Sequence, residues 1–287
     1  LDFAEAARRY SQDAKSKDLG GFLGFVQPSG DERFGGAVQA LVPGVLAGPL
    51  ETKSGVQLLL RHTFDEGQAK EAGTTIPAYG FFIPWKGSPQ GGSRTREEAE
   101  QDAKDFVERI SKGEADLVAA AQPFKSERDE HPGALVGLVR RTAETKEFYD
   151  ALASVEPGQF IPVQEFPGGY TVIQRGRLLR ALVRHLLIQH RESPNRPLSV
   201  TRSREEAKAL AEKVLAEADP RGSNWSELIR KYHEEPGTMS REGSLGATVN
   251  GGLYETLEQA LLDTESGSVA GRVAESPVGF HLLYRVK

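Results

Sequence analysis

A helix-start pattern occurs twice in this chain. Thr-Arg-Glu-Glu-Ala at residues 95–99 recurs as Ser-Arg-Glu-Glu-Ala at residues 203–207. In both copies a hydroxyl and a Glu three residues later are suited to bond the free amides at the start of a helix, which is the capping-box pattern. Apolar residues follow at matching positions and predict one buried helical face per copy. The chain therefore predicts successive similar units rather than one large domain.

Further elements repeat around these helices. Residues 3–10 match residues 225–232 class for class, and the apolar residues 117–121 occupy the same place in the middle copy. Leading strands are predicted at residues 79–83 and 181–188. Each copy ends in a short apolar segment that contains Gly, a third helix and a final strand. These patterns predict an α+β fold of tandem units, each a small four-stranded antiparallel sheet surrounded by three to four helices.

The repeats predict how the chain divides. We expect a first repeat at residues 1–64, a linker at residues 65–78 rich in Gly, Thr and Ala, a middle repeat at residues 79–176 and a C-terminal repeat at residues 177–287. The first repeat has no segment that matches the leading strand and first helix of the others, and the chain does not begin with Met. The expectation is a first repeat truncated at its N-terminal end.

Composition excludes several classes of protein. With 38% hydrophobic and 27% charged residues and a net charge of -5, the chain is predicted to be globular, without a nucleic-acid partner. No stretch reaches the roughly 18 apolar residues of a spanning helix. The chain has no Cys, which excludes disulfides and thiolate nucleophiles. The histidines lack metal-ligand spacing, so neither a metal nor a cofactor is expected.

Several short segments stand in a set order in the C-terminal repeat. They lie between His185-Leu186-Leu187 and Gly279-Phe280-His281, at residues 201–207, 232–237, 243–246 and 267–271. In this order and spacing they resemble the parvulin family of peptidyl-prolyl cis/trans isomerases. The first and middle repeats are similar to the same family by way of the C-terminal repeat, with fewer of its motifs.

The resemblance implies a PpiC-type isomerase, or rotamase, whose C-terminal repeat acts on Xaa–Pro bonds of unfolded or partly folded polypeptides. Rotation about such a bond faces a barrier of roughly 18–20 kcal/mol, and no covalent bond has to break. The site needs an apolar slot for the proline ring and polar groups where charge shifts in the twisted amide. The alternative is a non-catalytic, chaperone-like array that binds extended polypeptide.

The resemblance also assigns site residues. His185 and His281 match the paired strand histidines of the catalytic centre, and Glu235, with Glu234 as its rival, matches the acidic position. The proline slot is assigned to three leucines, Leu245, Leu253 and Leu257. If the family resemblance is set aside, a His in an apolar strand is more often a residue of the hydrophobic core. Adjacent Glu residues then indicate a solvated turn, and the leucines are ordinary core residues.

The loop at residues 189–202 is basic and carries Arg191, Arg196 and Arg202. In some parvulins a longer basic loop at this place binds a phosphate before the substrate proline, and a guanidinium group suits that ligand. Arg196 is therefore a candidate substrate-binding residue. Gln189 occupies a position where a Lys would favour phosphate binding, and Glu192 reduces the positive charge of the loop. The competing interpretation is therefore a solvated basic loop without a ligand.

The other two repeats lack site residues. In the middle repeat Gly80 replaces the first His, Thr171 replaces the second and Asp129 is a displaced acid, so we predict no isomerase activity there. In the first repeat Gln57 takes the place of the second His. The acidic place and slot positions are retained in that repeat by Asp13, Leu23 and Phe34.

Location follows from the resemblance. Bacterial parvulins with several units are mostly exported, which implies the periplasm or cell envelope of a bacterium, while the cytoplasm stays open. The expected partners are proline-containing polypeptide clients. The sequence predicts neither their identity, nor a preference for the residue before proline, nor an oligomeric state.

Overall fold

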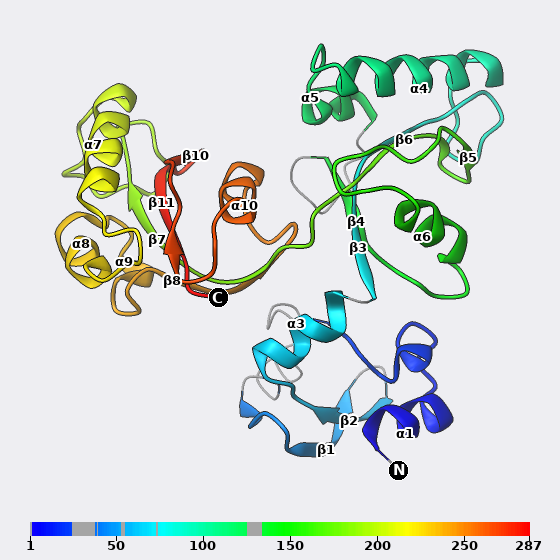
Figure 1. Ribbon diagram of the computed structural model, residues 1–287, viewed down its shortest axis with the longest axis horizontal. Helices are drawn as coiled ribbons and strands as arrows, with labels where there is room; N and C mark the ends of the chain where they lie inside the picture. The colour runs from blue at the N-terminus through cyan, green and yellow to red at the C-terminus, as the bar shows by residue number, and fades with distance from the viewer. Residues whose placement is uncertain (1, 25–37, 39, 53–54, 73, 125–133) are drawn as a thin grey trace. The chain divides into compact units, whose positions relative to one another are not determined.

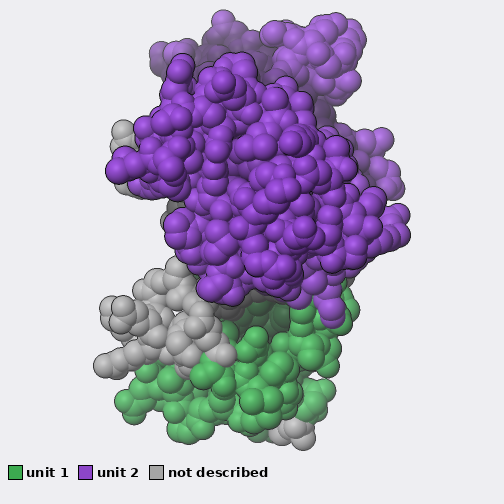
Figure 2. All heavy atoms as spheres, turned by 90° about the vertical axis from the view of Figure 1, so that its left-hand side faces the viewer, with its two compact units in different colours: residues 1–75, 140–150 green, residues 76–139, 151–287 purple. Residues whose placement is uncertain are grey.

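A computed structural model describes residues 2–24, 38, 40–52, 55–72, 74–124 and 134–287. The chain divides into two compact units, one of residues 1–75 with 140–150 and the other of residues 76–139 with 151–287 (Figure 2). Helices and antiparallel sheets alternate along the chain, which confirms the predicted α+β class. Within the described residues, no helix is both long and apolar enough to cross a lipid bilayer.

The described residues of the first compact unit include a short hairpin, several helical segments and, from residues 140–150, the start of α6 (Lys146–Ala153). Its elements are α1 (Phe3–Tyr10), η1 (Lys17–Leu19), β1 (Leu46–Thr52), β2 (Gly55–Leu60) and α3 (Phe64–Ala72). Helix α1 begins where the Asp2 carboxylate accepts the Glu5 amide proton, which makes Asp2 its N-cap. The predicted linker at residues 65–78 holds most of α3 and the start of strand β3 (Thr75–Ile83).

The middle repeat is built on a four-stranded sheet in the order β4-β3-β6-β5. Beyond β3 its elements are α4 (Arg96–Ser111), α5 (Leu117–Ala121), η2 (Gln122–Phe124), β4 (Leu135–Arg140), α6 (Lys146–Ala153), β5 (Glu165–Phe166) and β6 (Gly169–Arg175). The predicted capping box is present: Thr95 and Glu98 bond each other's backbone amides at the start of α4. Ala99 and Ala103 of that helix are fully buried against the sheet side chains Phe81 and Val172.

The C-terminal repeat has strands in the order β10-β11-β7-β8, with the short strand β9 also pairing with β11, so its sheet has five strands where four were predicted. Its elements are β7 (Arg180–Ile188), α7 (Arg204–Glu217), α8 (Trp225–Tyr232), α9 (Pro236–Met239), β8 (Ser244–Val249), α10 (Glu255–Leu262), β9 (Ser268–Val269), β10 (Ala274–Ser276) and β11 (Gly279–Arg285). The second predicted capping box, Ser203 with Glu206, starts α7.

Helices cover both faces of this sheet (Figure 1). Because side chains alternate along a strand, Leu186 and Phe280 face α7 and α8, where they pack with the buried Trp225. Val183 and Leu283 point to the opposite face, which α10 covers with Leu257 and other apolar residues. Burying one side chain of this size contributes about 2–3 kcal/mol, so two apolar layers fix the sheet between the helices.

Candidate active site in the C-terminal repeat

Two buried histidines meet on the α10 face of the sheet. His185 pairs with Leu283 across the antiparallel strands β7 and β11, and His281 pairs with Leu187. The two-residue stagger places both imidazoles on one face, where their Nδ1 atoms lie 3.1 Å apart and the rings stack with centroids 5.4 Å apart. Each histidine is only 3% exposed. The pair predicted from the two ends of the repeat is therefore brought together.

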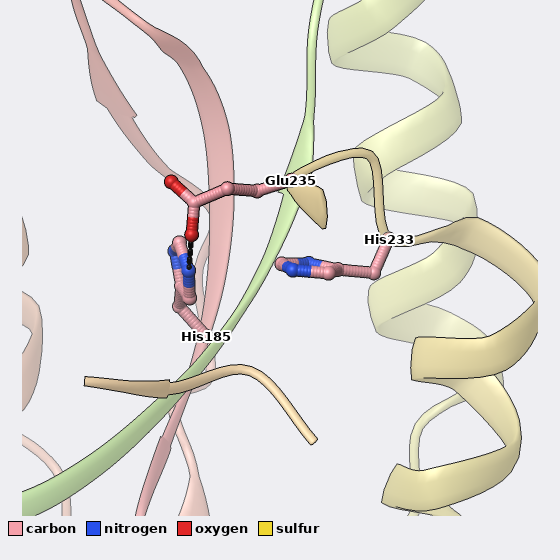
Figure 3. A group of neighbouring side chains, drawn as sticks. All are labelled: His185, His233 and Glu235. Atoms are coloured by element: carbon pink, nitrogen blue, oxygen red, sulfur yellow. Dashed lines mark hydrogen bonds and ion pairs between the residues drawn. The ribbon is translucent and has the colours of Figure 1, made fainter. Parts of the chain in front are cut away.

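The acidic residue beside this pair is Glu235 and not its neighbour Glu234. Glu235 follows the end of α8, and its Oε2 lies 3.1 Å from Nε2 of His185 (Figure 3). Glu234 faces away, because its carboxylate accepts hydrogen bonds from Arg202 and from the backbone amide of Gln189. Of the two carboxylates, only that of Glu235 contacts a site histidine.

The site holds an ionised acid and, on β11, a neutral histidine. Hydrogen bonds from His185 and Thr238 lower the pKa of Glu235 from 4.5 to about 2 despite partial burial. Burial lowers the pKa of His281 to about 3, because the imidazolium form loses its hydration. At neutral pH Glu235 carries a negative charge, with 39% of its side chain exposed, and His281 is uncharged. The arrangement offers a fixed charge at the rim of a buried polar network.

Three residues of this network were not assigned to the site from the sequence. Thr238 donates to Glu235 Oε2 at 2.6 Å, and Nε2 of His233 lies 2.8 Å from the Thr238 hydroxyl. On the other side Ser276 Oγ lies 2.8 Å from Nε2 of His281. Their only sequence signal is nearness, since Thr238 stands three residues after Glu235 and Ser276 five before His281.

His185, His233 and Glu235 form a set of potential metal ligands, because one ligand atom from each lies within 4.8 Å of the others (Figure 3). Two imidazoles and a carboxylate are a known zinc donor set. However, Nδ1 of His233 accepts the Leu187 amide proton at 3.1 Å. A neutral imidazole that binds metal through Nε2 carries its proton on Nδ1. In His233 that N–H would face the backbone N–H of Leu187, so two donors would meet with no acceptor between them. The residues fit a hydrogen-bonded network better than a metal site.

The three predicted slot leucines lie on the same sheet face as the histidines. Leu245 on β8, Leu253 before α10 and Leu257 on α10 all join the apolar cluster of Val183 and Leu283, the strand neighbours of the two histidines on that face. Leu257 is 2% exposed, whereas the other two leucines are half-buried. An apolar lining thus shares a face with the polar network.

Arg196 is held within its own loop. Its Nε donates to the carbonyl of Val200 at 3.3 Å. The other two arginines of the loop also have partners: Arg202 bonds Glu234 and Arg191 lies 3.7 Å from Glu192. These contacts place none of the three guanidinium groups against Glu235 or the two site histidines, so a role in substrate binding stays a prediction for Arg196.

In the middle repeat the two replaced positions are occupied as the sequence predicts. Gly80 pairs with Ile173 and Phe82 pairs with Thr171, the register that His185 and His281 have in the C-terminal repeat. Asp129 and Phe34 fall outside the described residues.

The retained residues of the first repeat have local contacts. Gln57 lies on β2 opposite Leu50. Asp13 accepts a hydrogen bond from Ser16, which lowers its pKa. Leu23 is 41% exposed. The described contacts of this repeat thus include no counterpart of the histidine pair.

Known proteins resemble this chain along most of its length. Two models of the PPIC-type PPIase domain match it, one at residues 172–286 and one at residues 1–63 and 86–176. The chaperone SurA of Pseudomonas syringae pv. syringae is 27% identical over 191 residues, which cover 63% of this chain and 42% of that protein. SurA of Alkalilimnicola ehrlichii is 25% identical over 242 residues, 81% of this chain and 52% of that protein. The chain spans roughly half the length of these curated relatives.

Two solved structures are similar to part of this chain. The crystal structure of the PPIase domain of TbPar42 is 28% identical, with a TM-score of 0.34 over 37% of this chain and 99% of that one. Peptidyl-prolyl isomerase ESS1 from Candida albicans is 26% identical, with a TM-score of 0.32 over 38% of this chain and 63% of that one. The assignment itself rests on the family models, one of which matches more than half of the residues. The chain belongs to the family of PPIC-type peptidyl-prolyl isomerase domains, the parvulins.

Proposed function

We propose that the C-terminal repeat catalyses cis/trans isomerisation of Xaa–Pro bonds through His185, Glu235 and His281. The observation that carries this proposal is the continuous contact between two buried histidines and one partly exposed, ionised carboxylate. Beside them, Leu245, Leu253 and Leu257 provide the apolar surface that a proline ring requires.

The chemistry follows from the electronic structure of the amide. Planar amides are stabilised by conjugation, which places negative charge on the oxygen, and twisting the C–N bond removes that conjugation. A carboxylate near the amide oxygen repels the planar forms more than the twisted one, so it lowers the barrier by differential binding. Glu235 supplies this charge, while His185 and His281 hold its position. The reaction transfers no proton, electron or group and therefore requires no cofactor.

A second function is favoured for the middle repeat by its lack of both histidines. It keeps the sheet register and helix packing of the family but has Gly80 and Thr171 at the two histidine positions. We propose that it binds extended polypeptide without turnover and raises the local concentration of client near the C-terminal repeat. Residues 1–64, 79–176 and 177–287 are the proposed repeats, which the two family matches support.

The decisive experiment is an isomerisation assay on an Ala-Pro peptide with the whole chain, by NMR exchange or protease coupling. We expect Glu235→Gln and His281→Ala each to lower kcat/KM by about 100-fold, the typical effect of removing one preorganised polar group. Thr171→Val in the middle repeat is the matched control and should leave kcat/KM unchanged. If the wild-type chain does not accelerate isomerisation of the peptide, the isomerase proposal is refuted and the non-catalytic, polypeptide-binding array is the remaining hypothesis.

Clients and location are part of the same proposal. The relatives named SurA are chaperones, which supports proline-containing, incompletely folded polypeptides as clients. We propose the bacterial periplasm or cell envelope as the location. Fractionation of cells that produce the full-length protein tests this, and recovery in the cytoplasmic fraction alone would contradict it.

A further inference from the structure

Behind Glu235 lies a second, buried polar pair formed by His233 and Thr238. His233 is 5% exposed and Thr238 is 7% exposed. His233 caps the end of α8 and Thr238 lies in α9, so the turn that carries Glu235 connects them. Nε2 of His233 lies 2.8 Å from the Thr238 hydroxyl, and that hydroxyl lies 2.6 Å from Oε2 of Glu235.

The direction of this chain of hydrogen bonds is fixed by a backbone amide. Leu187 donates its N–H to Nδ1 of His233, so Nδ1 has no proton and the ring proton of the neutral imidazole is on Nε2. Burial lowers the pKa of His233 to about 4, so the ring is neutral under ordinary conditions. Nε2–H then donates to Thr238, and the Thr238 hydroxyl donates to Oε2 of Glu235 at 2.6 Å, while Nε2 of His185 lies at the longer distance of 3.4 Å from the same hydroxyl.

This series occupies one oxygen of the carboxylate. Oε2 of Glu235 accepts from Thr238 and from Nε2 of His185, whereas no described residue donates a hydrogen bond to Oε1. In Figure 3 one carboxylate oxygen points to His185 and the other points away from the group. Two donors on one oxygen fix the torsion of the carboxylate, so the second oxygen has a defined direction.

We infer that His233 and Thr238 are positioning residues of the isomerase site, which fix Glu235 through Oε2 so that Oε1 is presented to the substrate amide. The inference rests on the proposed function, because it assigns a role within that site. It also explains why a histidine is buried beside a charged residue without contacting solvent: its two ring nitrogens link the backbone of β7 to the acidic turn.

The titratable groups around Glu235 lie on several elements. His185 on β7 contacts it directly, while His233 at the end of α8 and His281 on β11 are coupled to it electrostatically. Glu234 on the same turn is bonded to Arg202. A hydroxyl that donates to a carboxylate favours the ionised form, so removing the Thr238 hydroxyl should raise the pKa of Glu235.

The test compares Thr238→Val, which removes the hydroxyl at nearly constant volume, with Thr238→Ser, which retains it. In the full chain we expect Thr238→Val to lower kcat/KM by about tenfold at neutral pH, the loss of one hydrogen bond to a charged group. The fall of its kcat/KM at acidic pH should begin at a higher pH than in the wild type, with KM little changed. Thr238→Ser should restore both the rate and the acidic part of the pH profile. A Thr238→Val chain with the wild-type rate and pH profile overturns the inference, whatever its melting temperature.

Two NMR measurements separate this inference from the proposed function. The first is the titration of the Glu235 carboxyl carbon, which should shift to higher pH in Thr238→Val even if no Xaa–Pro bond is isomerised. The second is the ¹⁵N chemical shifts of the His233 ring nitrogens in the unmutated chain, which should report the Nε2–H tautomer. This measurement does not depend on whether a variant folds. An Nδ1–H tautomer refutes the inference, and it does so independently of any loss of activity.

Discussion

The middle and C-terminal repeats share a scaffold but differ in what lies at its centre. Gly80 and His185 occupy equivalent register positions, and each donates its backbone amide to the residue before the adjoining strand, Ala134 at 2.7 Å and Gly243 at 2.8 Å. The first Arg of each capped helix also bonds a Glu near the last strand, Arg96 to Glu165 and Arg204 to Glu275. The fold is therefore maintained by packing and backbone pairing, which do not require the histidines.

The two positions have other local contacts in the middle repeat. Gly80 has a φ of +136°, and a Cβ placed there would lie 1.9 Å from the carbonyl oxygen of Val172. Thr171, at the second histidine position, is fully buried and uses its hydroxyl to bond the Gln164 amide and the Pro162 carbonyl. Both positions belong to a local structure that differs from that of the C-terminal repeat, so we expect that a single substitution does not create the site there.

The strongest test of this comparison is Gly80→His. The new side chain meets both a left-handed backbone conformation and a backbone oxygen, so we expect a destabilisation of about 3 kcal/mol or more and no gain of isomerase activity. Urea denaturation of the full chain measures the effect. Gly113→Ala is the control, because it has a φ of +72° with no atom within 4 Å and isolates the cost of the backbone alone. Equal stability of the two variants would contradict the steric explanation.

Acid should distinguish the repeats next. His281 and His233 have pKa values of about 3 and about 4 when folded, below the ordinary 6.5, so the unfolded chain binds protons first. The stability they confer is complete above pH 6.5 and falls with pH below it, by up to about 1.4 kcal/mol per pH unit for each group. Below pH 4.5 protonation of Glu235, whose folded pKa is about 2, adds a smaller loss because its side chain is partly exposed.

The measurement is hydrogen exchange at pH 7 and pH 4.5. The described part of the middle repeat contains no histidine, so its amides should retain their relative protection while those of β7 and β11 lose theirs. Parallel loss in both repeats would show that the buried histidines do not set the acid stability of the C-terminal repeat.

The smallest effect is expected for Thr171→Val. It removes two hydrogen bonds from a buried hydroxyl and leaves their partners unpaired, which costs about 1–2 kcal/mol. Thr171→Ser, which keeps the hydroxyl, should be close to the wild type in thermal melting. If Thr171→Val also lowered isomerase activity, the division between a binding repeat and a catalytic repeat would be wrong.

Sequence patterns located elements and strand positions but not the contacts that depend on tertiary structure. The capping boxes at Thr95 and Ser203 are local, so they could be read directly. The position of His281 opposite Leu187 follows from the repeat. By contrast, the orientation of Glu234 depends on Arg202, which lies on a different loop, and His233 accepts a hydrogen bond from an amide 46 residues earlier. Such partners are set by packing, which the repeat pattern does not encode.

The bond between Arg202 and Glu234 has a consequence for motion. The Glu234 carboxylate also accepts the Gln189 amide proton at 2.6 Å, so both ends of the basic loop are tied to the residue next to Glu235. These hydrogen bonds connect the loop to the acidic turn. If a polypeptide client contacts this loop, less conformational entropy is lost when the Glu235 carboxylate is aligned with it. Substitution of Arg202 by a shorter residue should leave the negative charge on Glu235 but allow its carboxylate a wider range of orientations.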